Sequence, residues 1–298
     1  MPELPEVESL RRGLEKRILN QKILNVWVGK PKLVSGRGNI RKASIAKVKK
    51  FITELEGETF KSISRQAKNL IFNFKSGKVL VVHLKMSGQL VYQAKNPKEK
   101  KVWGGHPIEI TEQKLPHKHS HVIFKLSRGT LYYNDTRMFG YLLYYPSLAD
   151  AGSHFETYGL DPITPEFTLK KFAEGLQNKK GKLKTVLMGQ TVVTGVGNIY
   201  ADESLFRAKI HPLRNASSLK PAEIKNLYTA IKKILRRAIE LGGSSVADYL
   251  LADGSRGNYA RELKVYGRGG LPCTRCGTIL SEIQVNNRTT VYCKKCQK

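Results

Sequence analysis

Cysteine and long apolar runs are both scarce in this sequence of 298 residues. No apolar run approaches the roughly 18 residues that a membrane-spanning helix needs. The N-terminus also lacks the pattern of a signal peptide. We therefore expect a cytoplasmic protein with no membrane partner. The sequence contains only four cysteines, all of them between residues 273 and 296, so cysteine chemistry is confined to the C-terminal end.

Acidic residues are few compared with basic ones. There are 52 lysines and arginines against 24 aspartates and glutamates, which gives a formal net charge of +28 and a pI of about 10.0. Basic clusters occur at 47–50, 98–101, 179–184 and 232–237, so the charge is not carried by one basic tail. Such a chain is attracted to polyanions, and nucleic acid is the first candidate. A generically cationic surface and a membrane-surface protein are the alternatives.

The apolar pattern divides the chain into a β-rich part and a helical part, with no internal repeat. Up to about Pro146 it indicates strands, at 23–28 and in two hairpins at 70–84 and 121–133. Residues 148–166 contain two glycines and two prolines and indicate a linker. From 167 to 241 the apolar spacing is helical. We expect a β-rich N-terminal domain, a helical second domain and a small C-terminal appendage.

The segment that begins at Pro2 combines a secondary amine with carboxylates. If Met1 is removed, Pro2 presents a free amine with a pKa of about 7.7–8.0, which is partly neutral and can attack an electrophilic carbon. Glu3 lies beside it and could move a proton. The alternative is a plain helix N-terminus, with a proline in the first turn and acidic residues that complement the helix dipole. One apolar helical face supports that alternative and comprises Leu4, Val7, Leu10 and Leu14.

The four cysteines form two Cys-x-x-Cys pairs, Cys273 with Cys276 and Cys293 with Cys296, separated by 16 residues. Two such knuckles suit a tetrahedral four-thiolate zinc site at the tips of a β-hairpin. Two disulfides and a redox dithiol are the alternatives. A cytosolic location disfavours the disulfides, and the presence of two matched pairs disfavours a redox dithiol. Because four thiolates leave no open coordination position, we expect one structural Zn²⁺ that takes no part in the chemistry.

Two glycines, Gly195 and Gly197, stand just ahead of a helix that we expect from about Ile199 to Lys209. Glycines there let backbone N–H groups approach an anion at a helix N-terminus. Asn198 can add a side-chain donor, and Lys184 lies one helix upstream. In isolation, a plain turn between helices explains a Gly-x-Gly more often than an anion site does.

Three segments together resemble a known family, bacterial formamidopyrimidine-DNA glycosylase (the Fpg/Nei family). They are Pro-Glu-Leu-Pro-Glu-Val-Glu at 2–8, Gly-Val-Gly-Asn-Ile-Tyr-Ala-Asp-Glu at 195–203 and the four-cysteine segment. The resemblance covers essentially the whole chain. It implies an α+β fold with an N-terminal catalytic β-sandwich domain flanked by helices (1–150), a helix–two-turn–helix DNA-binding domain with a lesion-capping loop (151–266) and a C-terminal zinc-finger β-hairpin (267–298).

The same resemblance implies a function in base excision repair. The enzyme would be a monomeric, nucleoid-associated DNA glycosylase that removes oxidised purines, chiefly 8-oxoguanine and formamidopyrimidines, from damaged double-stranded DNA. It would also act as a lyase on apurinic or apyrimidinic sites, nicking the strand by β,δ-elimination. Two other functions stay open: an endonuclease VIII-like glycosylase for oxidised pyrimidines and a non-catalytic zinc-dependent DNA-binding protein. Leu4, at a position where the pyrimidine enzymes have glycine, disfavours the former, and the retained Pro2 and Glu3 disfavour the latter.

Four residues would be catalytic by this resemblance. Pro2 would attack the anomeric carbon of the flipped nucleotide to form an iminium ion, and Glu3 would protonate the sugar ring oxygen. Lys68 matches the family lysine that reaches the lesion-side phosphate, and Arg288 is suited to phosphates on the zinc hairpin. An ordinary exposed strand lysine is the alternative for Lys68.

Eight further residues would contact or position the DNA: Glu6, Met86, His119, Arg137, Phe139, Lys184, Asn198 and Tyr266. Met86 and Phe139 would fill the hole that a flipped base leaves in the duplex, and Arg137 would contact the orphan cytosine. Without the resemblance, Met86 and Phe139 would be assigned to the core. Glu6 would help to orient the pocket, and residues 244–258 match the loop that closes over 8-oxoguanine.

Several positions depart from the family pattern without removing a catalytic group. Lys85 stands where glycine is common, Met138 where a basic residue is usual, and Gly189 and Ser120 where aspartate is usual. Residues 94–116 look like an insertion, in which we expect Trp103 to be a loop anchor. These departures could shift substrate preference and affinity for the duplex.

Overall fold

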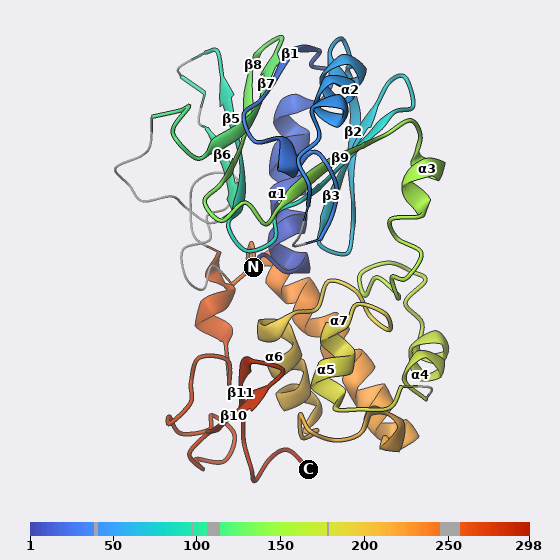
Figure 1. Ribbon diagram of the computed structural model, residues 1–298. Helices are drawn as coiled ribbons and strands as arrows, with labels where there is room; N and C mark the ends of the chain where they lie inside the picture. The colour runs from blue at the N-terminus through green and yellow to red at the C-terminus, as the bar shows by residue number, and fades with distance from the viewer. Residues whose placement is uncertain (39–40, 97, 100, 106–113, 178, 245–256) are drawn as a thin grey trace. The chain divides into compact units, whose positions relative to one another are not determined.

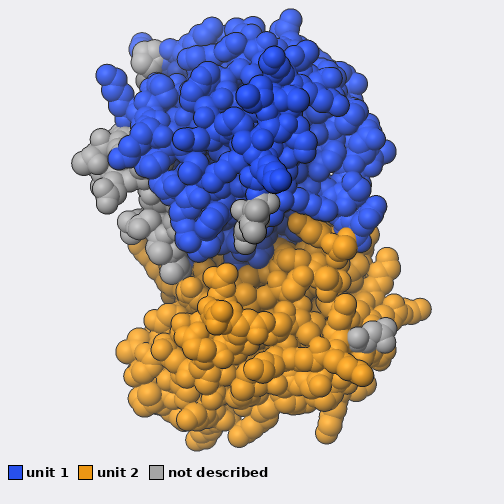
Figure 2. All heavy atoms as spheres, viewed as in Figure 1, with its two compact units in different colours: residues 1–156, 242–258 blue, residues 157–241, 259–298 orange. Residues whose placement is uncertain are grey.

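The computed structural model describes residues 1–298 except 39–40, 97, 100, 106–113, 178 and 245–256 (Figure 1). The chain divides into two compact units (Figure 2). Unit 1 comprises residues 1–156 and 242–258, and unit 2 comprises residues 157–241 and 259–298. No helix of the described part is both long enough and apolar enough to cross a membrane.

Unit 1 is built on two antiparallel sheets. The five-stranded sheet has the order β1 (Ile23–Val28), β7 (Ser120–Leu126), β8 (Gly129–Asp135), β5 (Gly88–Ala94) and β6 (Val102–Gly105). The four-stranded sheet has the order β2 (Phe60–Gln66), β3 (Asn69–Phe74), β4 (Val79–His83) and β9 (Tyr141–Tyr145). Side chains of both sheets contribute to one buried cluster, which confirms the predicted β-sandwich.

Helix α1 (Leu4–Ile18) positions the N-terminus. Its apolar residues recur at helical spacing and are buried, at Leu4, Val7, Leu10, Leu14 and Ile18. This stripe lets α1 pack against strands of both sheets, as Figure 1 shows for unit 1. The predicted apolar helical face is therefore confirmed.

The described part of unit 1 has three further helices, all short: η1 (Pro31–Leu33), α2 (Ile45–Leu55) and α3 (Leu148–Gly152). The sequence pattern predicted strands for this part of the chain and did not predict α2. Ser44 caps α2 by accepting a hydrogen bond from the N–H of Lys47 at 3.2 Å, and Phe51 and Leu55 are its buried residues. The segment that we expected to be a linker contains α3.

Unit 2 is mainly helical and ends in a hairpin. Its elements are α4 (Leu169–Gln177), α5 (Leu183–Met188), α6 (Asn198–Ala208), η3 (Ala216–Ser218) and α7 (Pro221–Glu240), followed by η4 (Asn258–Glu262), β10 (Ser281–Val285) and β11 (Arg288–Tyr292). The apolar faces of α4 to α7 form one buried cluster, which confirms the predicted helical domain. A small separate core around Phe206, Val265 and Leu280 supports the C-terminal hairpin.

Candidate active site and DNA-contact residues

The start of α1 gathers the residues that the sequence singled out first. Pro2 is buried, Met1 before it is 44% exposed, and the side chains of Glu3 and Glu6 are each only 3% exposed. The N–H of Glu3 donates a hydrogen bond to Oε2 of Glu6 at 2.9 Å, one turn ahead. Helix capping and catalysis are therefore compatible interpretations of this segment, because Glu3 and Glu6 form a capping box and Glu3 directly follows Pro2.

Glu6 is held from a distant part of the chain. Its Oε1 accepts hydrogen bonds from the backbone N–H of Ser244 at 2.8 Å and from its hydroxyl at 3.1 Å. Gly243 has a φ of +91°, and a Cβ at this position would come within 2.7 Å of the same oxygen. The expected lesion-capping loop thus starts at a residue that contacts Glu6, whereas its residues 245–256 lie outside the described part of the chain.

Lys68 lies in the tight turn between β2 and β3, where Gln66 pairs with Asn69. Ala67, the first turn residue, has a φ of +55°, a conformation that suits a two-residue hairpin. Arg65 stabilises the turn because its Nη1 donates to the carbonyl of Ala67 at 2.7 Å, while its Nε pairs with Glu8 of α1 at 3.2 Å. Lys68 is buried, so it is not the exposed strand lysine of the alternative interpretation.

Met86, Arg137 and Phe139 lie together on unit 1, as the resemblance implies. Nη1 of Arg137 is 3.5 Å from Sδ of Met86, and the guanidinium carbon lies 4.7 Å from the centre of the Phe139 ring. Met86 and Phe139 are only half-buried and Arg137 is exposed. The two apolar side chains therefore do not belong to the core, and they form one partly exposed group with the arginine.

Asp135 organises this group, and the sequence analysis did not identify it. One carboxylate oxygen accepts from the hydroxyl of Ser87 at 2.5 Å and from the N–H groups of Arg137 and Met138 at 3.3 and 3.0 Å. The other oxygen accepts from Gly140 N–H at 2.8 Å. Asp135 is fully buried and so links the Met86 segment to the Arg137–Phe139 segment.

His119 lies next to the same aspartate through the backbone. The N–H of Asp135 donates to the carbonyl of His119 at 3.1 Å, and the His119 ring lies 6.1 Å from that of His117 and 6.3 Å from that of His121. His119 is half-buried.

Two positions that depart from the family pattern have left-handed backbone conformations. Lys85 has a φ of +53° and Met138 a φ of +55°, which explains why glycine suits the position of Lys85. The N–H of Lys85 donates to Nδ1 of His83 at 2.9 Å. Burial and the nearby Lys85 and Lys68 hold the pKa of His83 well below its usual value, so His83 is a neutral acceptor. The side chain of Trp103 lies outside the described residues.

In unit 2 the glycine pair lies at the N-terminus of α6, as expected. Gly195 has a φ of +80°, and its N–H donates to Oε1 of Gln190 at 2.8 Å. The amide of Gln190 donates in turn to the carbonyl of Val196 at 2.8 Å. Asn198 is the first residue of the helix, and its Nδ2 donates to the carbonyl of Thr289 at 3.1 Å. Gln190 therefore fixes the loop, and the sequence analysis had missed it.

Lys184 requires a correction. Its side chain has no exposed surface, and Nζ forms an ion pair with Asp202 at 2.6 Å and donates to Oγ1 of Thr290 at 2.7 Å. Burial raises the pKa of Asp202 to about 7, opposed by Lys184 and by the N–H of Val291. An ammonium group in this position does not reach solvent. Lys184 therefore does not contact DNA directly as predicted. It supports strand β11 through its bond to Thr290.

Tyr266 and Arg288 lie at the surface of unit 2. Glu203, which is buried, accepts hydrogen bonds from the N–H groups of Lys264, Val265 and Tyr266 at 2.9 to 3.0 Å and so fixes the backbone that carries Tyr266. Arg288 is exposed at the start of β11, directly after the Asn286–Asn287 turn of the hairpin. Arg288 is thus exposed and Tyr266 is partly exposed.

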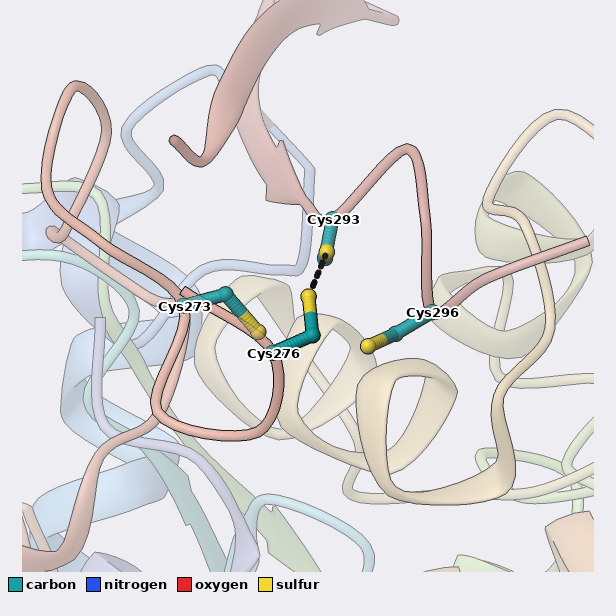
Figure 3. A group of neighbouring side chains, drawn as sticks. All are labelled: Cys273, Cys276, Cys293 and Cys296. Carbon is teal, nitrogen blue, oxygen red and sulfur yellow. Dashed lines mark hydrogen bonds between the residues drawn. The ribbon is translucent and has the colours of Figure 1, made fainter. Parts of the chain in front are cut away.

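The four cysteines converge on one point, as Figure 3 shows. Their sulfur atoms all lie within 4.8 Å of one another, and Sγ of Cys276 is 3.5 Å from Sγ of Cys293. All four are free thiols, and thiolates around zinc with bonds of about 2.3 Å would be roughly 3.8 Å apart. The knuckles lie at the open end of the hairpin, since Cys273 and Cys276 precede β10 and Cys293 directly follows β11. The set fits a tetrahedral zinc ion.

Comparison with known proteins agrees with this geometry. Residues 1–142 match the family model of the formamidopyrimidine-DNA glycosylase N-terminal domain, residues 158–249 match the formamidopyrimidine-DNA glycosylase H2TH domain, and residues 270–298 match the zinc finger found in FPG and IleRS. This chain belongs to the formamidopyrimidine-DNA glycosylase family. It is therefore an enzyme of a DNA-repair family, with an H2TH region and a zinc-finger segment whose four cysteines could hold a metal.

Individual members of the formamidopyrimidine-DNA glycosylase family match over their whole length. A formamidopyrimidine-DNA glycosylase of Desulfitobacterium hafniense is 39% identical, with all of both chains covered. A mutant FPG of Lactococcus lactis, in complex with Fapy-dG containing DNA, is 37% identical with a TM-score of 0.84 and full coverage of both chains. The Lactococcus lactis enzyme bound to DNA with an abasic site is 36% identical, with a TM-score of 0.82 and 99% coverage of both chains.

Proposed function

We propose that this chain is a bifunctional DNA glycosylase and abasic-site lyase that removes oxidised purines, including formamidopyrimidines and 8-oxoguanine, from damaged double-stranded DNA. The observation that carries this proposal is that the buried Pro2 is followed at the start of α1 by two buried carboxylates, Glu3 and Glu6, which are linked by a hydrogen bond. Complexes of relatives with Fapy-dG and abasic-site DNA support both activities.

The first step requires the amine that loss of Met1 exposes. The nitrogen lone pair of Pro2 attacks C1′ of the flipped nucleotide, and the bond from C1′ to the base breaks as the base leaves with a proton. The nitrogen then loses its own proton. Glu3 protonates O4′, the bond between C1′ and O4′ opens, and a cationic iminium forms between the nitrogen and C1′.

The iminium then allows strand cleavage. It acidifies the hydrogen on C2′, and removal of that proton expels the 3′ phosphate in the β-elimination. A second proton loss expels the 5′ phosphate in the δ-elimination. Glu3 is the group placed to move these protons, and Glu6 orients the site through its hydrogen bond with the N–H of Glu3.

Other residues would bind the DNA. Lys68 would contact the lesion-side phosphate, Arg288 would contact a DNA phosphate, and Asn198 offers its amide at the N-terminus of α6. Met86 and Phe139 fill the space that the flipped base leaves, and Arg137 contacts the orphan base. One zinc ion, held by the four cysteines, would organise the hairpin that carries Arg288.

Borohydride trapping tests the proposal. The reductant should convert the iminium into a stable amine and lock the protein to a duplex with a single 8-oxoguanine, and mass spectrometry should place the adduct on Pro2. An adduct on Lys68 would overturn the role of Pro2. Intact DNA with no adduct would favour the non-catalytic DNA-binding alternative, and excision of oxidised pyrimidines alone would favour the endonuclease VIII-like one.

A further inference from the structure

Unit 2 contains a groove of about 940 Å³ that none of the proposed catalytic or DNA-contacting residues lines. Its walls come from the C-terminal half of α6, from α7, from the segment 259–264 and from the first cysteine knuckle. It uses the basic cluster at 232–237, to which the proposed function gives no role. A groove of this size holds a few residues of a peptide or one small molecule.

The rim of the groove is strongly basic. Six basic residues on it have no carboxylate within 4.0 Å in the described part of the chain: Arg207, Lys232, Lys233, Arg236, Lys264 and Arg275. The acidic residues of the groove are already engaged. Glu262 and Glu240 pair with Arg237 at 2.6 and 3.3 Å, and Glu203 accepts three backbone N–H groups. The groove is therefore complementary to an anionic partner.

The floor of the groove is apolar, but its aromatic faces are covered. The guanidinium of Arg275 lies 4.4 Å from the centre of the Phe206 ring. Tyr228 stacks on Phe167 at 4.9 Å, and the ammonium of Lys232 lies 5.0 Å from the Tyr228 ring centre. Single-stranded nucleic acid binds by stacking bases on open aromatic faces. Phe206 and Tyr228 offer no such face and Tyr259 is only 4% exposed, whereas the floor can still accept an aliphatic side chain.

Double-stranded DNA also fits poorly. The phosphates of a duplex lie on the outside of a broad cylinder, which cannot enter a concavity of this volume. The groove is at the C-terminal end of α6, and Asn198 is at the other end, nine residues or about 14 Å away along the helix axis. An occupant of the groove would therefore leave the N-terminus of α6 free.

We propose that this groove binds an acidic peptide segment of a partner protein. Its carboxylates would pair with the basic rim around Lys233 and Arg236, and an aliphatic side chain would lie on the apolar floor near Ile234 and Tyr228. Charge attraction steers such a partner and gives a salt-dependent affinity, and the buried aliphatic contact adds selectivity. The partner would be recruited while the enzyme is on DNA.

Fluorescence anisotropy with a labelled synthetic peptide, Asp-Asp-Leu-Asp-Asp-Leu-Asp-Asp, tests the proposal on the full zinc-loaded chain. The double variant Lys233→Glu/Arg236→Glu should weaken binding by about tenfold or more. The matched control Lys225→Glu/Lys170→Glu changes the net charge equally at exposed positions outside the groove and should change binding by less than about twofold. Both variants should retain the same zinc content and the same excision activity as each other.

Three results would overturn the proposal. The first is equal weakening in the two double variants, because attraction would then be due to net charge alone. The second is equal binding of a peptide with serine in place of both leucines, because the apolar floor would then play no part. The third is displacement of the peptide by a short single-stranded oligonucleotide in the control variant but not in the groove variant, because nucleic acid would then be the occupant.

Discussion

Glu6 and Ser244 are joined by two hydrogen bonds although 238 residues separate them in the chain. One oxygen of the Glu6 carboxylate accepts both bonds, and the other oxygen accepts the N–H of Glu3. These bonds link Ser244, where the segment that matches the lesion-capping loop begins, to Glu6. Glu6 is bonded in turn to the backbone of Glu3, the proposed acid. Gly243 makes this contact possible, since no side chain fits between it and Glu6.

Gly243→Ala should damage catalysis. The added Cβ would clash with the Glu6 carboxylate, and alanine would be strained at the φ of +91° that Gly243 has. Together the clash and the strain should cost about 1–3 kcal/mol. We expect kcat/KM for excision of 8-oxoguanine to fall about tenfold or more. Ser244→Ala is the control, because it removes only the hydroxyl bond and keeps the shorter bond from the backbone N–H. If both variants lose activity equally, the position of Glu6 does not depend on Gly243.

Glu3→Gln should separate binding from chemistry. Glutamine keeps the size of the side chain but cannot donate the proton to O4′, so single-turnover excision should fall by about 10²- to 10⁴-fold. Affinity for lesion-containing DNA should change little. Pro2→Gly keeps a free amine but loses the ring, and both excision and borohydride trapping should decrease. Normal trapping in Pro2→Gly would contradict the role of Pro2.

Arg288→Ala and Arg137→Ala should have different effects. Loss of the phosphate contact of Arg288 should weaken the binding of lesion-containing and undamaged duplexes alike. It should also reduce the slope of log affinity against log salt concentration by about 0.9. Loss of Arg137, which lies between Met86 and Phe139, should mainly reduce the preference for cytosine opposite the lesion. Filter binding with both duplexes at several salt concentrations measures both quantities. Identical effects on the two duplexes would refute this division of roles.

Cys276→Ser should remove the metal. We expect the purified protein to carry one zinc per chain and the variant to carry much less, because three thiolates no longer close the tetrahedral site. DNA binding should be lost with the hairpin that carries Arg288. The two sheets of unit 1 have their own core, so their thermal transition should persist. Active protein with well below one zinc per chain would contradict the prediction.

His154 should make unit 1 less stable in mild acid. Burial, with Arg37 and Lys85 nearby, lowers the pKa of His154 to about 4 from its usual 6.5. Between these values the unfolded chain binds a proton that the folded chain does not, so stability falls as the pH falls from about 6.5 to about 4. His154→Gln should flatten this dependence, although it keeps only part of the bonding to Tyr141 and Tyr145. Urea unfolding at pH 7, 5.5 and 4.5 measures the slope, and equal slopes would refute the assignment.

Helix α7 could be predicted from the sequence because its apolar residues recur at helical spacing. The two hairpins of unit 1 could be predicted because each consists of two mostly apolar runs around a turn, and their strands are buried almost throughout. Helix α2 was overlooked although its apolar residues recur at helical spacing, at Ile45, Val48, Phe51, Ile52 and Leu55. Of these residues only Phe51 and Leu55 are buried, and Ile45 at the start of the helix is 71% exposed.

The candidate site could be predicted where a motif carries it, at Pro2, at Gly195 and at the cysteines. The supporting residues could not be found in this way. Asp135, Gln190 and Glu203 form hydrogen bonds with backbone N–H and carbonyl groups. Because nearly every residue has these backbone groups, the sequence does not show which of them such a side chain will bind. Lys184 was predicted to contact or position the DNA, and its buried ion pair could not be predicted because Asp202 lies on a different helix and a sequence does not show which charges meet.

The ion pair of Lys184 and Asp202 also determines how the metal segment is attached. It joins α5 to α6, and both residues hold β11, Lys184 through Thr290 and Asp202 through the N–H of Val291. Detaching the hairpin would break the bonds that these two charged groups make with Thr290 and with the N–H of Val291, at a cost of about 1.5–3 kcal/mol for each bond to a charged group. The zinc-finger segment is thus packed against α5 and α6 and is not attached to them by the chain alone. It folds and unfolds with the helices, so a chelator should act on the stability of all of unit 2.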